Sequence, residues 1–412
     1  MKNVKYARCV KCGKIYEAVP DLTNCECGGI LDIVYDYDYI RSVLTKEKLA
    51  ARPHTMWRYR ELLPVEEDTA DTPLRVGWSP LYEEPRLAKQ LGIAKLWVKD
   101  DGQNPTASLK DRASAMAVAK AREAGYHTIA CSSTGNAASS LAGNAAAAGL
   151  ETYIFVPSRA PKGKVAQLMT FGAHVISVQG NYEETFELSK AAIEKWGWYN
   201  RNAAINPYLS EGKKTVSLEI AEQLGWQMPD YLAISVGDGC TIAGVWKGLK
   251  DLYAIGFIDK LPRLISAQAE GCHPINRAIA TGEPWYPMEE NTLADSIAVG
   301  VPRNADKALM AIRESNGIVV NVTDEEIMAA QKLLGMTCGV FGEPAGVTGT
   351  AGLKKLCEQG VIPADATVVS VVTGNGLKDV ANAIKFCGEP ISIPNDMELL
   401  QQAFRDAGIA VE

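Results

Sequence analysis

The chain has 412 residues and a formal net charge of −7, and 47% of its residues are hydrophobic while 22% are charged. This length and composition are typical of a globular enzyme with two or three domains. The acidic balance argues against nucleic acid as a partner, and no stretch approaches the roughly 18 consecutive apolar residues of a membrane span. The first residues carry no apolar signal segment, so we expect a cytoplasmic protein.

Four cysteines cluster near the start of the chain, as Cys9-Val-Lys-Cys12 and Cys25-Glu-Cys27. Two cysteine-bearing turns separated by a hairpin-like stretch can supply the four thiolates of a structural zinc ribbon. The second pair has one intervening residue where a zinc knuckle usually has two. Two interpretations therefore stay open: a closed, non-catalytic zinc site, or a small reduced β-module without metal.

The remaining chain predicts an α/β fold. After a helix expected at about 40–48 and a proline-containing loop, strand-like and helix-like segments alternate from residue 95, which is typical of a doubly wound, mostly parallel sheet. The expected strands are 95–100, 128–133, 151–156, 174–179, 231–236, 263–269, 318–323 and 367–372. The expected helices are 109–124, 137–148, 163–171, 182–196, 211–224, 241–254, 274–280, 305–315, 324–335, 345–358 and 377–386.

The stretch Asn104-Pro-Thr-Ala-Ser-Leu-Lys-Asp-Arg112 follows an expected strand and opens an expected helix. We expect Ser108 to cap this helix, which places Lys110 at a sheet edge, where α/β proteins bind ligands. Lys110 is therefore the candidate reactive amine. A lysine in a first helical turn is more often a solvated surface residue, so this interpretation depends on three further stretches.

The first of these, Cys131-Ser-Ser-Thr-Gly-Asn136, runs from a strand end through a glycine turn into a helix. The amides and hydroxyls at a helix N-terminus bind anions, so Ser133, Thr134 and Asn136 are candidates for holding a substrate carboxylate. The alternative is simple capping of the helix by these side chains.

The second stretch, Gly237-Asp238-Gly239-Cys240-Thr241, again links a strand to a helix. Its glycines allow the backbone to approach an anion, and its threonine offers a hydroxyl, which together favour a phosphate cradle. It is not a P-loop, because no Gly-Lys-Ser/Thr follows. It is not a dinucleotide fingerprint either, because it lies far from the first strand.

The third stretch, Val368-Val-Ser-Val-Val-Thr373, is an apolar strand that ends in a Thr-Gly-Asn-Gly turn. The hydroxyl of Thr373 at the carboxyl end of the strand is placed to meet a ring nitrogen in the same crevice. The alternative is a turn with a helix cap.

Together these motifs resemble those of the fold-type II family of pyridoxal-phosphate-dependent enzymes, most closely its threonine synthases. The resemblance spans nearly the whole chain and implies two doubly wound α/β domains of the tryptophan synthase β type, preceded by a zinc-ribbon-like module. The boundaries that we expect are 1–35 for the module, 36–110 with 200–412 for the large cofactor-binding domain, and 111–199 for the smaller inserted domain. The matching stretches are the cysteine module, Trp57-Arg-Tyr-Arg-Glu-Leu-Leu63, Ser108-Leu-Lys-Asp-Arg112, Ser132-Ser-Thr-Gly-Asn136, Glu343-Pro-Ala345 and Thr373-Gly-Asn-Gly-Leu-Lys-Asp379.

The resemblance also implies roles for the candidate residues. Lys110 would form the Schiff base with pyridoxal 5'-phosphate and act as the catalytic base, and the run 237–241 would hold the cofactor's phosphate. Asn136 would hydrogen-bond the phenolic oxygen, and Thr373 would meet the pyridine nitrogen. A neutral hydroxyl leaves that nitrogen unprotonated, which suits elimination and replacement along the substrate's side chain.

The implied activity converts O-phospho-L-homoserine and water to L-threonine and phosphate, in a homodimer. Lys162 and Lys164 would either meet the departing phosphate or be solvated. Departures from the family pattern, such as Trp78-Ser-Pro80, leave a second reading open: a β-replacing or eliminating paralogue similar to cysteate synthase or to a serine/threonine dehydratase. A third reading is a zinc-ribbon adaptor on an inactive α/β body, in which Lys110 would be idle.

Overall fold

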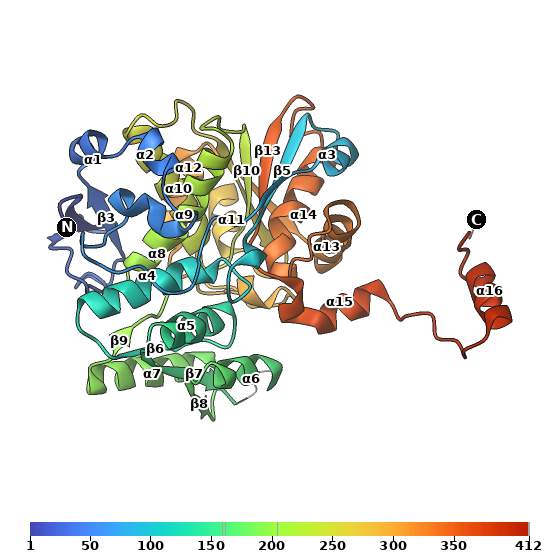
Figure 1. Cartoon of the computed structure of the whole chain (residues 1–412), viewed down its shortest axis with the longest axis horizontal. Helices are drawn as coiled ribbons and strands as arrows, with labels where there is room; N and C mark the ends of the chain where they lie inside the picture. The colour runs from blue at the N-terminus through green and yellow to red at the C-terminus, as the bar shows by residue number, and fades with distance from the viewer. Residues whose placement is uncertain (159, 161, 204, 411–412) are drawn as a thin grey trace.

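The computed structural model describes residues 1–158, 160, 162–203 and 205–410, apart from the side chains of residues 162, 163 and 182. The strands of these residues form three separate sheets (Figure 1). Every helix in this part of the chain is too short or too polar to span a bilayer.

The largest sheet has the strand order β12-β11-β10-β13-β5-β4 and is parallel except for β4, which runs antiparallel to β5. Alternate side chains of its central strand β10 enter two different hydrophobic cores: Leu232 and Ile234 face one, and Tyr231 and Ala233 face the other. Burial on both faces is typical of a parallel sheet covered by helices. The strands are β4 (Leu81–Glu83), β5 (Lys95–Asp100), β10 (Tyr231–Ser235), β11 (Arg263–Ala269), β12 (Ile318–Val322) and β13 (Thr367–Val372).

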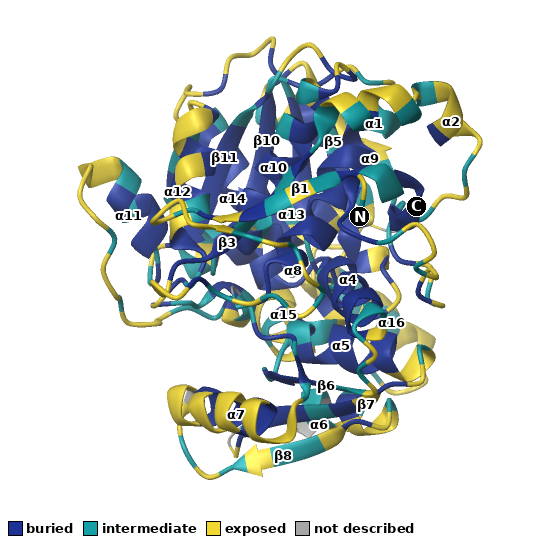
Figure 2. Ribbon diagram, turned by 90° about the vertical axis from the view of Figure 1, so that its left-hand side faces the viewer, coloured by how far each residue is buried: buried dark blue, intermediate teal, exposed yellow. Residues whose placement is uncertain are grey.

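Helices cover both faces of this sheet, and buried residues are concentrated in the strands and the helix faces turned toward them (Figure 2). These helices are α3 (Pro85–Leu91), α8 (Tyr208–Lys213), α9 (Thr215–Gln223), α10 (Cys240–Ala254), α11 (Pro274–Thr281), α12 (Ala305–Glu314), α13 (Asp324–Cys338) and α14 (Pro344–Glu358). Short 3-10 helices are η2 (Asp101–Gln103), η3 (Asp295–Ile297) and η4 (Gly376–Asp379).

The second sheet is smaller, parallel throughout, and has the strand order β8-β7-β6-β9. Its strands are β6 (Thr128–Ser132), β7 (Glu151–Pro157), β8 (His174–Val178) and β9 (Tyr199–Asn200), and the associated helices are α4 (Lys110–Glu123), α5 (Asn136–Ala147), α6 (Lys162–Thr170) and α7 (Tyr182–Trp196). Because α5 carries no charged residue, it is buried from Ala138 to Ala145 between α4 and this sheet.

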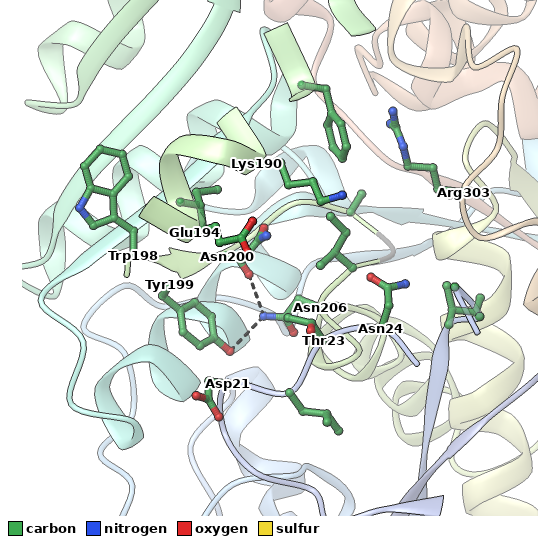
Figure 3. A pocket seen from close by; sticks show the side chains of 18 of the residues that line it. Asp21, Thr23, Asn24, Lys190, Glu194, Trp198, Tyr199, Asn200, Asn206 and Arg303 are labelled. Carbon is green, nitrogen blue, oxygen red and sulfur yellow. Dashed lines mark hydrogen bonds between the residues drawn. The ribbon is translucent and has the colours of Figure 1, made fainter. Parts of the chain in front are cut away.

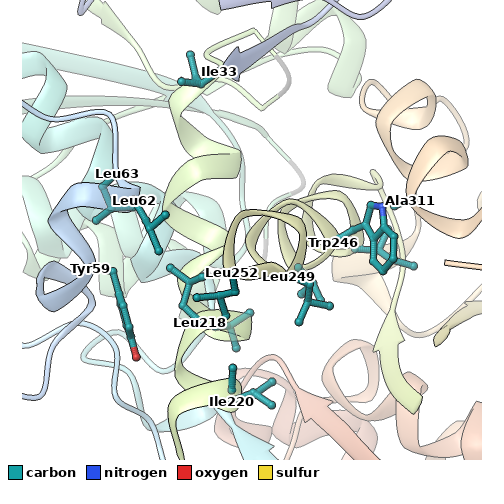
Figure 4. Close-up of a cluster of buried hydrophobic side chains, with 14 of the residues drawn as sticks. Ile33, Tyr59, Leu62, Leu63, Leu218, Ile220, Trp246, Leu249, Leu252 and Ala311 are labelled. Atoms are coloured by element: carbon teal, nitrogen blue, oxygen red, sulfur yellow. The ribbon is translucent and has the colours of Figure 1, made fainter. Parts of the chain in front are cut away.

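The third sheet, β2-β1-β3, is antiparallel and forms the N-terminal module with β1 (Val4–Cys9), β2 (Ile15–Tyr16) and β3 (Leu31–Tyr35). The segments α1 (Tyr37–Val43), α2 (Lys46–Ala50) and η1 (Met56–Leu62) follow it. The module shares a core with the large body, in which Ile33, Leu62, Leu218 and Leu249 belong to one buried cluster (Figure 4). At the other end of the chain, α15 (Val380–Cys387) and α16 (Met397–Asp406) lead away from the body, and α16 contains no buried residue (Figure 1).

All eight strands expected from residue 95 onward are present, each within one residue of the expected bounds. The helix expected at 211–224 is wrong in its bounds, because two helices, α8 and α9, meet at Lys214. The helix expected at 40–48 is also two helices, since Thr45 adopts an extended conformation and caps α2 by accepting a hydrogen bond from Lys48 N. The domain boundaries expected from the sequence stay a prediction.

Candidate active site

The loop between β5 and α4 places Lys110 at the carboxyl edge of the large sheet. Asp111 anchors this loop, because its carboxylate accepts hydrogen bonds at 2.8 Å from Thr106 N, from Thr106 Oγ1 and from Asn144 Nδ2. Burial raises the pKa of Asp111 to about 6, although these hydrogen bonds stabilise the ionised carboxylate and so lower its pKa. Ala107 has a φ of 66°, a left-handed conformation that costs a non-glycine residue about 1 kcal/mol. The backbone that carries the lysine is therefore locally constrained.

Ser108 does not cap α4, so this expectation is wrong. The cap position belongs to Leu109, and Ser108 Oγ is buried with no hydrogen-bond partner among the described residues. The backbone of Ser108 pairs instead with Gly374, and Leu109 N donates to the carbonyl of Thr373 at 2.8 Å. These main-chain contacts tie the lysine loop to the end of β13 and leave the serine hydroxyl away from the helix amides.

Arg112 fixes the start of α4 to the large body. Its fully buried guanidinium donates to Asp101 at 2.7 and 2.8 Å and to Glu219 at 2.5 and 2.7 Å, and Lys99 donates to Glu219 at 2.9 Å. Burial would raise the pKa of Glu219, yet the charges of Arg112 and Lys99 lower it to about 2. Two cations and two carboxylates compensate one another here, so removing one partner would leave a buried charge at a cost of about 3–5 kcal/mol.

Lys110 opens onto a narrow cavity at the carboxyl ends of β10 and β13. Burial, which has the largest effect, and the nearby charge of Lys213 lower the pKa of its amine to about 8, although the charge of Glu343 opposes them. The amine is therefore far easier to deprotonate than that of a solvated lysine. The cavity is lined by Lys110, Ala137, Arg201, Ala203, Lys213, Ser235, Val236, Gly237, Asp238, Gly239, Cys240, Thr241, Ile242, Ser296, Ile297, Glu343, Ala345 and Thr373.

The loop from β10 to α10 forms the expected cradle on one wall of this cavity. Gly239 has a φ of 86°, and a Cβ on it would lie 2.8 Å from the Cβ of Ala308. A Cβ on Gly237 would lie 2.8 Å from the Cα of Ile297. Only glycine fits at these two positions, and the backbone amides at the start of α10, with the Thr241 hydroxyl, suit a phosphate group.

Asp238 lies in the same loop, but its carboxylate is engaged elsewhere. It accepts hydrogen bonds from Arg303 N at 2.6 Å and from Cys240 Sγ at 3.2 Å. The acidic side chain therefore ties the cradle to the segment that precedes α12. Burial raises the pKa of the Cys240 thiol to about 11, so this cysteine is protonated and unreactive near neutral pH.

Asn136, the first residue of α5, reaches the cavity through Glu343. Its Nδ2 donates to Glu343 Oε1 at 2.6 Å. A Cβ on Gly374 would lie 2.2 Å from the same carboxylate oxygen, so glycine is required beside it. Burial raises the pKa of Glu343 to about 7, and both the charge of Lys110 and the hydrogen bond from Asn136 oppose this shift. The buried carboxyl group of Glu343 thus connects Asn136, which follows strand β6 of the small sheet, to the body of the large sheet.

Other expected residues lie outside this cavity. Ser133 and Thr134 do not contribute to its lining, and the Ser133 hydroxyl accepts a hydrogen bond from Gly135 N at 3.2 Å. Helix α5 begins without a side-chain cap, so the capping alternative is not observed. Lys164 forms an ion pair with Asp295, and the side chain of Lys162 lies outside the described residues.

Three lining residues were not singled out from the sequence: Glu343, Arg201 and Lys213. Glu343 was part of a matched motif, but nothing in Glu-Pro-Ala shows that the carboxylate is buried. Arg201 and Lys213 are 2% and 4% exposed and come from segments that read as an ordinary loop and helix. Only the tertiary packing brings their charges beside Lys110.

A larger cleft of about 880 Å³ is shown in Figure 3. It adjoins the lysine cavity, because Ala203 lines both. It lies among the N-terminal module, α7 and the loop after β9, where Asn206 Nδ2 donates to Tyr199 Oη at 3.0 Å and to Asn200 O at 3.1 Å. Its described lysines are exposed, and it lacks the glycine cradle. We therefore place the chemistry in the smaller cavity.

The four N-terminal cysteines converge at the edge of the module. Their sulfur atoms all lie within 4.8 Å of one another, with Cys9 to Cys27 at 3.6 Å and Cys12 to Cys25 at 3.5 Å. A tetrahedral zinc ion with Zn–S bonds of about 2.3 Å would separate its sulfurs by roughly 3.8 Å. A Cβ on Gly29 would lie 2.6 Å from Cys9 Sγ, so the glycine after the second pair leaves room for this arrangement.

Comparisons with known proteins agree with the fold. Residues 73–374 match the family model described as "Pyridoxal-phosphate dependent enzyme". Among solved structures, maize serine racemase superimposes with a TM-score of 0.64 at 22% identity, covering 80% of this chain and 92% of that one, which shows the shared fold. The chain belongs to the family of pyridoxal-phosphate-dependent enzymes, with the α/β fold of fold type II.

Curated relatives define its place within the family. The threonine synthase of Methanocaldococcus jannaschii is 42% identical over 402 residues, which cover 97% of this chain and 99% of that one. The threonine synthase of Methanosarcina acetivorans is 41% identical over 402 residues, which cover 97% and 98%. Within its family, the chain groups with the threonine synthases.

Proposed function

We propose that the chain converts O-phospho-L-homoserine and water to L-threonine and phosphate, with pyridoxal 5'-phosphate as cofactor. One observation carries this proposal: a partly buried lysine of lowered pKa shares a cavity with a glycine cradle at the carboxyl edge of a parallel sheet. The relatives named threonine synthase, at 41% and 42% identity over nearly the whole chain, support the choice of substrate.

The residues of the cavity fit the cofactor. Lys110 would hold its aldehyde carbon and the 237–241 loop its phosphate. Asn136, which does not line the cavity itself and donates to Glu343, would hold the cofactor's phenolic oxygen. Thr373 would meet the ring nitrogen with a hydroxyl that has no partner among the described residues. When bound, the cofactor withdraws electrons from the substrate's carbon atoms and so makes their protons easier to remove.

Lys110 is the residue that we assign to proton transfer. With a pKa of about 8, a useful fraction of its amine is unprotonated near neutral pH. The free amine removes the proton from the substrate's α-carbon and then moves protons at the β-carbon while phosphate leaves from the γ-carbon. Water supplies the hydroxyl group that threonine carries on its β-carbon.

Glu343 orients the side-chain amide of Asn136 beside the cavity. The Glu343 carboxyl accepts from the Asn136 side chain at 2.6 Å, which turns that side chain toward the large sheet. We assign the substrate's carboxylate to Ser133, Thr134 and the amides near Asn136. This contact requires the 133–135 loop to move toward the cavity, because neither hydroxyl lines it in the structure.

We assign structural zinc to Cys9, Cys12, Cys25 and Cys27, and the distances between their sulfurs support this assignment. We further propose a zinc-ribbon-like fold for the module and a cytoplasmic homodimer that acts on a small amino acid. Neither a membrane nor nucleic acid is expected as a partner.

Substrate preference tests this function. Phosphate release should be measured with O-phosphohomoserine and with phosphoserine under the same conditions. We expect kcat/KM for O-phosphohomoserine to be at least about 100-fold higher, since a site shaped for one chain length rejects the other. A preference for phosphoserine would assign the chain to the β-replacing enzymes instead.

A further inference from the structure

Lys213 is an unusual lysine for a protein interior. It ends α8, is 4% exposed, and lines the cavity that contains Lys110. Its stem packs against α10, because a Cβ on Gly244 would lie 3.2 Å from the Lys213 Cβ. Among the described residues, no carboxylate or carbonyl accepts a hydrogen bond from its Nζ.

The other deeply buried lysines each have a carboxylate partner, which Lys213 lacks among the described residues. Lys99 pairs with Glu219, Lys120 pairs with Glu123, and Lys214 pairs with Glu211 and Asp251. A buried cation is costly unless an anion compensates it. The position of Lys213 therefore indicates a negatively charged group that enters the cavity.

The charge of Lys213 lies close to the cradle. Cys240 is the first residue of α10, and burial raises the pKa of its thiol. Of the charged neighbours, Lys213 has the largest effect on this thiol, and it lowers the pKa. Lys213 and Cys240 also line the same cavity, so the ammonium group lies near the helix terminus that the 237–241 loop leads into.

We propose that Lys213 is the counter-cation of the cofactor's phosphate and pairs with it inside the cradle. This inference rests on the proposed role of the 237–241 loop. Backbone amides and a helix N-terminus supply partial charges only, whereas a phosphate monoester carries about −1.5 to −2. A full positive charge from Lys213 would bring the cradle closer to neutrality when such a phosphate is bound.

The positive charge of Lys213 also lowers the pKa of Lys110 in the cofactor-free protein. The groups facing Lys110 are Lys213 on α8, Arg201 after β9, Cys240 on α10 and Glu343 before α14. After burial, Lys213 does most to lower the pKa of Lys110, so an empty cradle keeps this amine partly unprotonated.

The experiment compares two ligands that differ in the phosphate alone. Cofactor-free full-length protein is titrated with pyridoxal 5'-phosphate and with pyridoxal, and dissociation constants are read from absorbance and tryptophan fluorescence. Lys213→Met should weaken binding of the phosphate form about 10- to 100-fold and change pyridoxal binding less than about twofold. Lys213→Arg should recover part of the loss. Lys250→Met, an exposed lysine on α10, is the matched control and should bind both ligands like wild type.

A second measurement concerns the pH at which Lys110 captures pyridoxal, a condensation of amine and aldehyde that releases water. The wild-type midpoint should lie near the pKa of about 8, and Lys213→Met should move it to higher pH. Unchanged cofactor affinity in Lys213→Met would overturn the proposal, as would an equal loss for both ligands. Normal cofactor affinity with lost inhibition by inorganic phosphate would assign Lys213 to the substrate's phosphate instead. If wild-type protein binds no cofactor, the proposed function fails first.

Discussion

Lys110 is only partly buried, and it differs from the fully buried lysines in what surrounds it. Lys99, Lys120 and Lys214 each pair with a carboxylate, and such a partner stabilises the charged form. Lys110 instead faces the positive charges of Lys213 and Arg201 as well as the carboxyl group of Glu343. Burial and the two cations favour the neutral amine, which is the form that reacts with a carbonyl group, while Glu343 opposes them.

Replacing this lysine should separate chemistry from folding. Lys110→Ala removes the only group that we assign to proton transfer, so turnover should fall by at least about 10⁴-fold, and the visible absorbance of the lysine-linked cofactor should vanish. The unfolding temperature of the cofactor-free protein should change little, because Lys110 is only partly buried and forms no ion pair with the residues that the structure describes. If Lys110→Ala kept activity and an absorbance spectrum close to those of wild type, the assignment of proton transfer to Lys110 would be wrong.

Glu343 should give the protein a distinctive dependence of stability on pH. Burial raises its pKa from 4.5 to about 7, so between these values folding takes up a proton. Its contribution to the free energy of unfolding is present below pH 4.5 and is lost as the pH rises through 7, by at most about 3 kcal/mol.

Glu343→Gln removes this titration. Urea unfolding of the cofactor-free protein at pH 5 and at pH 8 should show that wild type loses more stability than the variant over this interval. Glu358→Gln, an exposed control that pairs only with Lys354, should follow wild type. Parallel curves for wild type and Glu343→Gln would mean that the carboxyl group titrates normally.

At the scale of elements, three connections that follow the carboxyl ends of β5, β10 and β13 supply most of the site. They contribute Lys110, the 237–241 loop and Thr373. In a parallel sheet these ends meet at one edge, so residues distant in sequence converge without a dedicated scaffold. Asn136 arrives from the second sheet, and its bond to Glu343 links the two.

The cradle provides a test at this scale. Gly239→Ala places a Cβ 2.8 Å from Ala308 at a φ of 86°, so it should reduce stability by about 1–3 kcal/mol and weaken cofactor binding. Gly256→Ala is the matched control, because its φ is 76° but its Cβ would meet open space. The control should lose about 1 kcal/mol and bind cofactor normally, as shown by equilibrium titration. Equal cofactor affinity in both variants would contradict a tight cradle.

The sequence was sufficient to predict the elements whose signals are local. Long apolar strands such as 231–235 and 367–372, bounded by glycine turns, allow only a buried parallel arrangement, and they were found within one residue. Short elements such as β4 and β9 were missed, because two or three residues carry no periodicity. The prediction that Ser108 caps α4 was wrong, because a backbone bridge between Ser108 and Gly374 overrides the preference of serine for the cap position. Glu343 and Lys213 became visible only when packing showed their burial.

At the scale of the whole molecule, hydrogen bonds connect the N-terminal module to elements that lie next to the active site. Tyr208 donates to the carbonyl of Val19 at 2.6 Å, Tyr199 donates to the carbonyl of Pro20 at 2.9 Å, and Tyr35 donates to Glu211 at 2.6 Å. These residues lie on β3, β9 and α8, and α8 ends at Lys213. The module therefore supports the outer wall of the cavity without contributing a lining residue.

Chelation of the zinc that we assign to the module should loosen its first 35 residues. A segment of this size has too little core to fold alone, so the metal's binding energy is its folding energy. Limited proteolysis should then cut within this segment, while the cofactor's absorbance persists, since its proposed contacts all lie beyond residue 100. Well under one zinc per chain in protein purified without chelator would contradict the assignment. Loss of the cofactor spectrum on chelation would show that the module holds the cavity together.

The central claim is that Lys110 bears the cofactor. Reduction of the holoenzyme with borohydride fixes the cofactor on the lysine that carries it, and digestion followed by mass spectrometry identifies the modified peptide. We predict one pyridoxyl group per chain, on Lys110, and none in Lys110→Ala. Modification of another lysine, such as Lys213 in the same cavity, or of no lysine at all, would contradict this account.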